Sequence, residues 1–215
     1  MDIEIKKSTK PIKYNDALTQ LEARSKLVSK NEDKELIWIL EHEPIFTAGT
    51  SYSKNDIIDK SINVYETNRG GKITYHGPGQ LMFYFVIDLR NRKKDIRKFI
   101  SIIEDSLITY LSKHNVIAKS FKDRVGIWVI KSDNTEFDKE RKIGAIGLRI
   151  SKWVTYHGLS FNINPEMKYY SNIHSCGLIG YKNTSLKELG INITKDEFDN
   201  EFKDIYFDKL ANLSL

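Results

Sequence analysis

Three strand-like segments follow one another in the second half of the chain, and this run restricts the fold more than any other feature. They cover residues 125–130, 143–150 and 153–163, and no helical pattern separates them. Strands that follow one another without a crossover helix pair most readily as antiparallel neighbours. The sequence therefore predicts an α+β fold with a mixed, largely antiparallel sheet, and not a doubly wound parallel one.

Other segments supply further strands and the helices that cover them. Apolar residues in 36–40 and 81–89 predict two strands. Apolar residues recur at helical spacing in 14–28 and, more strongly, in 96–111. Two capping-box patterns predict a short helix after residue 185, ended by Gly190, and a longer one after residue 194.

The 215 residues contain no internal repeat and no linker, so we expect a single domain over residues 1–215. The longest apolar run, 81–87, is far shorter than the roughly 20 residues of a membrane span. The N-terminus lacks the apolar segment of a signal peptide. A single cysteine, Cys176, excludes an internal disulfide. These features predict a cytoplasmic protein without a membrane span.

Charge is spread unevenly along the chain. The net charge of +5 is too small to indicate a nucleic-acid partner. Six basic residues and one acid occupy 90–98. Such a run either attracts an acidic protein partner to a nearby site or is the solvated start of a helix, and the sequence leaves both interpretations open.

The segment 69–80, Arg-Gly-Gly-Lys-Ile-Thr-Tyr-His-Gly-Pro-Gly-Gln, contains four of the twelve glycines. Glycines allow a backbone to approach a ligand closely, and the arginine, lysine and histidine add hydrogen-bond donors. The segment matches neither the phosphate-binding loop nor the dinucleotide fingerprint. We therefore expect a binding loop of another kind.

Cys176 lies in a polar Ser-Cys-Gly sequence and not in an apolar stripe. A cysteine in this setting is a candidate nucleophile, provided that a neighbouring group stabilises its thiolate. From the residues alone, the activator is either Lys142, which begins a glycine-containing strand, or one of the histidines 76, 157 and 174. The chain has no metal-ligand spacing, so we expect no metal.

Four segments together resemble the octanoyltransferase family, also called lipoyl(octanoyl) transferases or lipoate-protein ligase B. Segment 41–49 is similar to a His-x-Pro-x-Phe-Thr-x-Gly motif, and 69–80 matches the family signature position for position. Segments 142–147 and 157–162 resemble the catalytic-lysine strand and the strand that follows it. Ser175-Cys176-Gly177 resembles a Pro-Cys-Gly nucleophile, with serine in place of proline and, at Gly144, glycine in place of a common alanine.

The resemblance implies a fold and a reaction. The fold is that of the biotin and lipoate ligase catalytic domain, with a main mixed sheet, helices against it and a smaller sheet beside it. The reaction moves an octanoyl group from acyl carrier protein to one lysine of a lipoyl domain, in 2-oxoacid dehydrogenase complexes or the glycine cleavage H protein. It is the first step of endogenous lipoate synthesis and needs no cofactor.

The resemblance also implies residue roles. Cys176 would be the nucleophile, and Lys142 would lower the pKa of its thiol and act as acid and base. Backbone amides near Gly147 and Cys176 would stabilise the oxyanion. The substrate would be bound by three segments: Arg69, Gly70, Gly71, Lys72, Ile73, Thr74, Tyr75 and His76; Ala145, Ile146 and Gly147; and His157, Gly158, Leu159 and Ser160.

Three other functions remain possible from the sequence. An ATP-dependent lipoate or biotin ligase shares the fold but needs a nucleotide site. A Cys–His thioester hydrolase would use His157 or His76 as its base. A binding module without activity would hold an acyl group or a carrier protein and would be indifferent to loss of Lys142.

Overall fold

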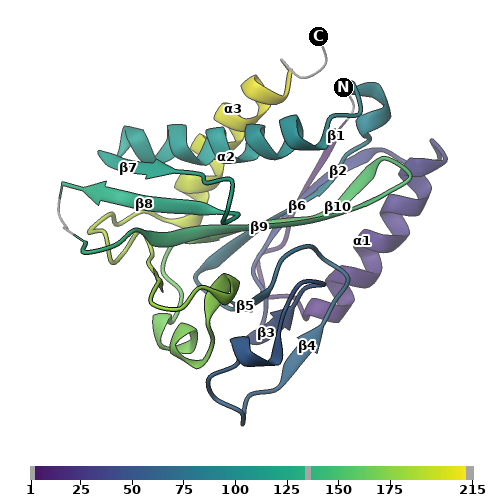
Figure 1. Ribbon diagram of the computed structural model, residues 1–215. Helices are drawn as coiled ribbons and strands as arrows, with labels where there is room; N and C mark the ends of the chain where they lie inside the picture. The colour runs from purple at the N-terminus through teal and green to yellow at the C-terminus, as the bar shows by residue number, and fades with distance from the viewer. Residues whose placement is uncertain (1–2, 134–136, 212–215) are drawn as a thin grey trace.

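The computed structural model describes residues 3–133 and 137–211, apart from the side chains of Cys176 and Ala211. Within these residues, eight strands form a main sheet in the order β1-β2-β6-β10-β9-β8-β7, with β11 beside β9 (Figure 1). The strands are β1 Ile3–Lys7, β2 Glu35–Leu40, β6 Gln80–Val86, β7 Val116–Lys119, β8 Ile127–Ser132, β9 Arg141–Ser151, β10 Val154–Asn162 and β11 Lys182–Asn183. Only the β1–β2 and β11–β9 pairs of this sheet are parallel.

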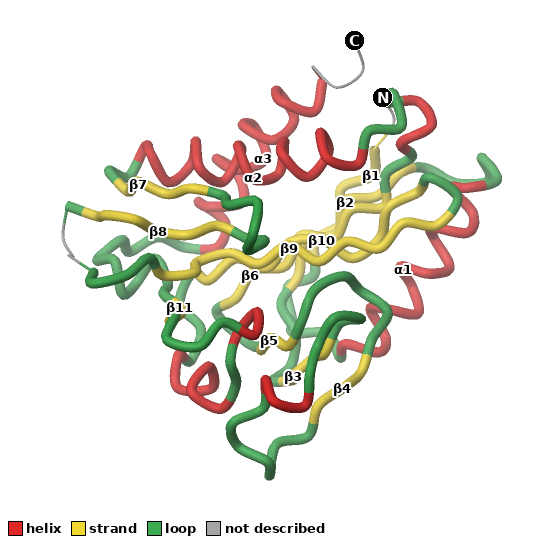
Figure 2. Tube along the Cα trace, viewed as in Figure 1, coloured by secondary structure: helices red, strands yellow, loops and turns green. Residues whose placement is uncertain are grey.

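A second, smaller sheet lies beside the main one. Its described strands are β3 Ile45–Ala48, β4 Val64–Glu66 and β5 Ile73–His76, in the order β4-β3-β5. Figure 2 shows this sheet below the main sheet, on the side of α1 Tyr14–Ser29. The described residues also form short 3-10 turns: η1 Lys54–Asp56, η2 Leu89–Asn91, η3 Met167–Asn172 and η4 Ser175–Gly177.

Helices cover both faces of the main sheet because its strands alternate two sets of apolar side chains. The helices α2 Ile96–Lys113 and α3 Lys195–Ala211 pack on the face that carries Phe83 and Phe85. The helix α1 packs on the opposite face, against Trp38 and Leu40. Met82 and Tyr84 belong to the α1 face as well, and this face continues into the space beneath the small sheet.

Most of the expected elements are present. The α+β class, the largely antiparallel main sheet and the smaller sheet are confirmed. The predicted strand 81–89 ends earlier, at Val86, and Leu89 begins η2. The Thr194 capping box is confirmed, since the backbone amide of Thr194 donates to the Glu197 carboxylate and the amide of Glu197 donates to the Thr194 hydroxyl.

The prediction of a short helix after residue 185 is wrong. Residues 186–190 form a turn and not a helix. The amide of Glu188 donates to Ser185, as a capping box requires, but the Glu188 carboxylate accepts from the Thr184 hydroxyl instead of the Ser185 amide. The reciprocal half of the capping box is therefore missing, and Gly190 ends a single turn.

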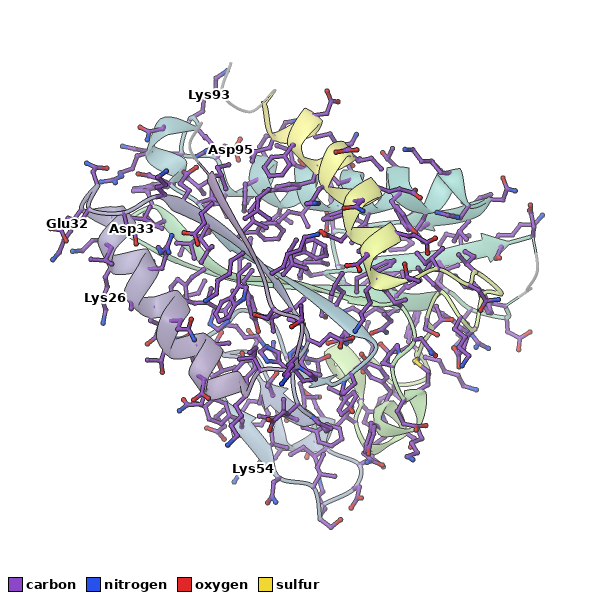
Figure 3. All side chains as sticks on the ribbon, turned by 180° about the vertical axis from the view of Figure 1, so that it is seen from behind. Lys26, Glu32, Asp33, Lys54, Lys93 and Asp95 are labelled. Carbon is purple, nitrogen blue, oxygen red and sulfur yellow. The ribbon has the colours of Figure 1, made fainter. Side chains whose placement is uncertain are left out.

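The basic run 90–98 is divided between exposed residues, Lys93, Lys94, Arg97 and Lys98, and two arginines that are held by carboxylates. Arg92 is buried and its guanidinium pairs with the Glu35 carboxylate at 2.5 Å. Arg90 is held by Asp88. The Lys94 ammonium lies over Trp153, at the start of β10, and six residues of strand, about 20 Å, separate that end from Ser160. Figure 3 shows Lys93 at the opposite end of the molecule from Lys54 of η1.

No helix in residues 3–133 or 137–211 combines the length and the apolar composition that a membrane crossing requires.

Candidate active site

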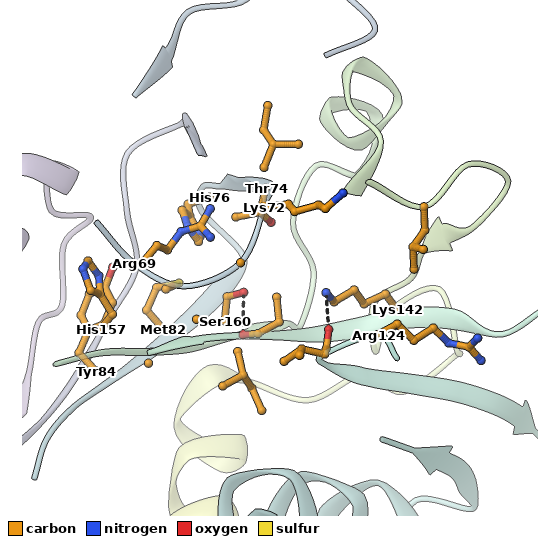
Figure 4. A pocket seen from close by; sticks show the side chains of 18 of the residues that line it. Arg69, Lys72, Thr74, His76, Met82, Tyr84, Arg124, Lys142, His157 and Ser160 are labelled. Carbon is orange, nitrogen blue, oxygen red and sulfur yellow. Dashed lines mark hydrogen bonds between the residues drawn. The ribbon is translucent and has the colours of Figure 1, made fainter. Parts of the chain in front are cut away.

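A cavity of about 200 Å³ separates the main sheet from the small sheet. Strands β9 and β10 form its floor, and the segment leading into β5 forms its roof (Figure 4). Lys142 and Arg124 lie at one end of the labelled residues and His157 and Tyr84 at the other. The cavity is therefore an elongated space between two sheets, with Lys142 at one end.

Twelve of the fifteen expected substrate-binding residues line this cavity. They are Arg69, Gly71, Lys72, Ile73, Thr74, His76, Ala145, Ile146, Gly147, His157, Gly158 and Ser160. Three segments that are far apart in the sequence thus meet around one space, because β9 pairs with β10 and the 69–72 loop is folded over both.

Gly70, Tyr75 and Leu159 do not line the cavity, and the alternation of strands explains two of them. Thr74 and His76 face the cavity, so Tyr75 between them turns into the aromatic cluster with Phe46. Gly158 and Ser160 face the cavity, so Leu159 is buried in the core beneath α2 and α3. The Gly70 amide instead donates to the carbonyl of Leu148 and ties the loop to β9.

Arg69 fixes the shape of the loop. Its guanidinium is buried and donates to the carbonyl and hydroxyl of Thr47, both at 2.9 Å, and to the carbonyl of Gly70 at 3.0 Å. These bonds join the loop to β3. Gly147 must be glycine here, because a Cβ at that position would lie 2.8 Å from the carbonyl oxygen of Gly70. The loop therefore lies directly on β9 and closes the roof.

Lys142 is buried although it carries an ammonium group. It is 4 % exposed, and its Nζ donates to the carbonyl of Val125 at 2.9 Å. The ammonium also lies 5.6 Å from the ring of Trp128. Gly126 gives this side chain its room, since a Cβ at residue 126 would lie 2.5 Å from Lys142 Cε, and the backbone there has φ +126°. Lys142 is thus held in one place at the end of the cavity.

The expected nucleophile lies on the turn η4 Ser175–Gly177. The side chain of Cys176 is outside the described part of the structure, so its role stays a prediction. The turn itself is well tied to its surroundings. Ser175 Oγ accepts a hydrogen bond from Asn183 Nδ2 at 2.9 Å, and Asn183 is paired in register with Lys142 between β11 and β9. A second, smaller cavity is lined by Lys142, Ser175 and Asn183 together.

Lys72 approaches the same turn from the roof. A Cβ at Gly177 would overlap its ammonium group and lie 2.8 Å from its Cδ. The ammonium also faces the carboxylate of Asp56 at 4.0 Å, and Asp56 accepts the backbone amide of His174 at 2.8 Å through its carbonyl. In Figure 4 the ends of Lys72 and Lys142 come from opposite walls of the cavity.

His76 is held neutral inside the cavity wall. Burial holds the pKa of His76 well below its usual value, and the charges of neighbouring groups lower it further. Its Nδ1 lies 2.6 Å from Gln80 Oε1, and Gln80 Nε2 donates to Asn162 and Tyr170. Since the Gln80 amide nitrogen points to two acceptors, its oxygen accepts from His76, which fixes the proton on Nδ1.

Two further histidines are also buried and neutral. Burial lowers the pKa of His42 to about 4 and the pKa of His157 to about 3, to which the positive charge of Arg69 contributes. His42 Nε2 accepts from the hydroxyl of Tyr84 at 2.6 Å, while its Nδ1 donates to a backbone carbonyl. His157 Nε2 donates to Asn68 Oδ1 at 2.9 Å. His42 follows the end of β2 and is not among the residues that line the cavity.

The cavity also contains residues that the sequence patterns did not indicate. Met82 and Tyr84 line it from β6, and Tyr14 lines it from α1. The alternation within 81–87 contained this information, because Met82 and Tyr84 share a face. Arg124 and Val125 line the end near Lys142, and no local pattern marked them. Val125 is 51 % exposed, so this end of the cavity opens to solvent.

The described residues contain no group of three or more histidine, cysteine, aspartate and glutamate side chains that could hold a metal ion.

The comparisons with known sequences agree on one family. The model of the lipoyl protein ligase A/B catalytic domain matches residues 13–207. An octanoyltransferase from Wolbachia pipientis wMel is 39% identical over 201 residues, which cover 93% of this chain and 96% of the relative. An octanoyltransferase from Parvibaculum lavamentivorans is 41% identical over 199 residues, with 92% and 88% coverage.

Comparison with solved structures gives the same fold at low identity. A structure of a bipartite lipoate protein ligase and its E2 lipoyl domain from Thermoplasma acidophilum aligns with a TM-score of 0.67 at 13% identity, covering 97% of this chain and 84% of that one. Lipoate-protein ligase A bound with ATP gives 0.67 at 14% identity, with 98% and 86% coverage. The biotin protein ligase of Aquifex aeolicus gives 0.55 at 12% identity, with 99% and 72% coverage.

Proposed function

The chain belongs to the lipoyl protein ligase A/B catalytic domain family and to its octanoyltransferases, and from this premise we propose the full reaction that it catalyses. It takes an octanoyl group from acyl carrier protein, holds it as a thioester on Cys176, and passes it to one lysine of a lipoyl domain. Residues 1–215 act as a single catalytic domain in the cytoplasm, and no cofactor takes part.

The observation that carries this proposal is the placement of Lys142. A buried ammonium at the end of an elongated cavity lies in register with Asn183, which in turn holds the turn that contains Cys176. A positive charge beside a cysteine favours its thiolate. A free thiol has a pKa of about 8.5, so a neighbouring cation that lowers it to about 7 supplies roughly 2 kcal/mol.

The first half of the reaction is an exchange between two thioesters. The Cys176 thiolate attacks the carbonyl carbon of the octanoyl thioester, and the negative charge that develops on the oxygen is stabilised by backbone amides near Gly147 and Cys176. The bond to the carrier sulfur then breaks, and the leaving thiolate takes its proton from the Lys142 ammonium, which becomes a neutral amine. The two thioesters have similar free energies, which is why no ATP is required.

The second half forms a more stable bond. The amine of the acceptor lysine attacks the Cys176 thioester and gives its proton to the neutral Lys142 amine, which becomes an ammonium again. The carbon–sulfur bond breaks, an amide forms, and the cysteine returns to the thiolate. The amide product is more stable than the thioester, and this difference drives the reaction.

The acyl chain occupies the cavity beyond Lys142. The floor there is made of Ala145, Gly147, Gly158 and Ser160, small residues that leave room above β9 and β10. Each methylene that leaves water stabilises the complex by about 0.8 kcal/mol. The wall that includes Met82 and Tyr84 closes the cavity at the end away from Lys142 and limits the length of chain that it accepts.

The histidines weigh against a Cys–His hydrolase. His76 and His157 are buried, their pKa values are lowered by burial, and each has one ring nitrogen committed to an amide side chain. A histidine that stays neutral far below pH 6 is a weak general base. His157 also lies at the other end of the cavity from Lys142 (Figure 4).

Intact-mass measurement after mixing with octanoyl carrier protein tests the proposal. We expect the octanoyl mass on the intact chain without ATP, its loss in Cys176→Ala, and its transfer to a lipoyl domain added afterwards. A requirement for ATP would instead indicate a ligase. Rapid release of free octanoate without an acceptor would indicate a hydrolase, and binding without any adduct would indicate a binding module.

A further inference from the structure

The two-residue strand β11 joins the two halves of the proposed catalytic pair. On one side it runs parallel to β9, with Asn183 opposite Lys142, and the amide of Thr184 donates to the carbonyl of Lys142 at 2.8 Å. On the other side Asn183 Nδ2 donates to Ser175 Oγ at 2.9 Å. One residue thus contacts both the strand that carries Lys142 and the turn that carries Cys176.

Few other hydrogen bonds hold the turn η4 on the side that faces the main sheet. Its own backbone bonds are those of Gly177 to the carbonyl of His174, at 2.8 Å, and of Leu178 to the carbonyl of Ser175, at 3.4 Å. A three-residue 3-10 turn is a weak element by itself. The contact of the His174 amide with Asp56 fixes the turn to η1 and the roof, at 2.8 Å. Among the contacts described for the turn, the Asn183 bond is the one that links it to the main sheet.

Burial makes this bond more effective. Ser175 is 9 % exposed, and it shares the smaller cavity with Lys142 and Asn183. A hydrogen bond between partly buried side chains persists because little water competes for its donor and acceptor. Its effect on the site is geometric, since the interaction between a thiolate and an ammonium falls with their separation.

We propose that Asn183 is a positioning residue, which sets the distance between Cys176 and Lys142 by holding Ser175. This inference rests on the proposed function. Ser175 is the first residue of its turn, and no backbone hydrogen bond from its amide is present among the described residues. Proline suits this position, because its fixed φ matches a helical start and its missing N–H costs nothing there. A proline at residue 175 can therefore fix the position of the turn through its rigid backbone, as the hydrogen bond from Asn183 does for serine.

The test measures octanoyl adduct formation from a small octanoyl thioester in single turnovers. We expect Asn183→Ala to form the adduct about tenfold more slowly, the scale of one lost hydrogen bond. Ser175→Ala should show the same tenfold loss. The double variant should also lose tenfold and not a hundredfold, because both changes remove one and the same interaction. Ser175→Pro combined with Asn183→Ala should regain most of the rate. Lys182→Ala, on the exposed neighbour in β11, should stay at the parental rate.

A second readout does not depend on transfer. The chain has one cysteine, so its alkylation rate against pH reports the thiol directly. We expect Asn183→Ala to move the midpoint upward toward 8.5 and Ser175→Pro to move it back. If the parent forms no adduct but the midpoint moves as expected, the proposed function fails and the positioning role stands. If Asn183→Ala leaves both rate and midpoint unchanged, or proline restores neither, Asn183 has no positioning role.

Discussion

Lys142 Nζ donates to the backbone carbonyl of Val125 at 2.9 Å, so the ammonium of β9 is anchored by the segment that leads into β8. This bond holds the lysine side chain at the end of the cavity. The segment before β8 thus belongs to the site as much as the strand that carries the lysine.

Cys176→Ala should abolish octanoyl transfer and leave the fold cooperative. The residue lies on the 3-10 turn η4 and not in a strand of either sheet, so we expect the variant to keep its fold. Intact mass after incubation with octanoyl carrier protein checks the loss of the adduct, and thermal unfolding checks the fold. Transfer above a few per cent of the parental rate would remove Cys176 from its proposed role.

Lys142→Ala should raise the pH at which the thiol is alkylated, from near 7 to about 8.5. The reason is that the thiolate loses the adjacent cation that stabilises it. Iodoacetamide rates between pH 5 and 10 give both midpoints. Lys139→Ala is the matched control, because Lys139 lies just before the same strand and its ammonium faces Tyr181. Identical midpoints in the Lys142 variant and the parent would favour a different activator.

Gly126→Ala should slow adduct formation by at least tenfold. A Cβ at residue 126 would lie 2.5 Å from Lys142 Cε and 3.0 Å from its Nζ, so the lysine must leave its position. Gly180→Ala provides the control for backbone strain, since Gly180 also has positive φ but its Cβ would lie 3.6 Å from its nearest neighbour. Equal losses of rate in the two variants would attribute the effect to strain and not to Lys142.

The free energy of unfolding should fall as the pH is lowered from about 6.5 to 5. His42 and His157 have pKa values of about 4 and 3 when folded and about 6.5 when unfolded. In this window the unfolded chain binds protons that the folded chain refuses, so acid favours unfolding. Each histidine contributes a slope of up to about 1.4 kcal/mol per pH unit.

Urea unfolding at several pH values measures this slope. His157→Asn should flatten it, because asparagine does not titrate and tolerates the positive φ of +62° at this residue. A slope that is unchanged in His157→Asn would show that other groups dominate acid unfolding.

Arg92→Met should destabilise the fold by about 3 kcal/mol, because it leaves the Glu35 carboxylate without its buried partner. Lys93→Glu combined with Lys94→Glu should change the free energy of unfolding by no more than about 0.5 kcal/mol. The KM for octanoyl carrier protein should also stay unchanged, since both lysines lie at the far end of β10. Chemical unfolding and steady-state rates check both statements. A raised KM in the lysine variant alone would support the docking role of the 90–98 run.

The sequence predicted those parts of the protein that depend on local pattern. Hydrophobic spacing located α1 and α2, and uninterrupted strand patterns located β8, β9 and β10, because a helix or strand must present one apolar face to the core. The reciprocal bonds at Thr194 formed as the capping pattern indicated. The helix predicted after residue 185 did not form, because the hydroxyl of Thr184, one residue earlier, donates to the Glu188 carboxylate.

Resemblance to known motifs selected most cavity residues but not their orientations. Segment 69–76 was assigned as one unit, whereas the alternation of β5 turns Tyr75 away from the cavity and keeps His76 in it. The same holds for Leu159 between Gly158 and Ser160. Orientation depends on which face of each strand is covered, and that is decided when the sheets pack.

The sequence by itself determined the strand and helix pattern, the family and the residue types available for acyl transfer, since these are properties of neighbouring residues. Only the tertiary structure decided that Arg92 is buried against Glu35, that Gly126 makes room for Lys142, and that Asn183 joins Ser175 to the strand of Lys142. Each of these contacts joins residues that are 8 to 57 positions apart. Packing, and not local propensity, brings such residues within hydrogen-bond distance, so no short segment contains the information.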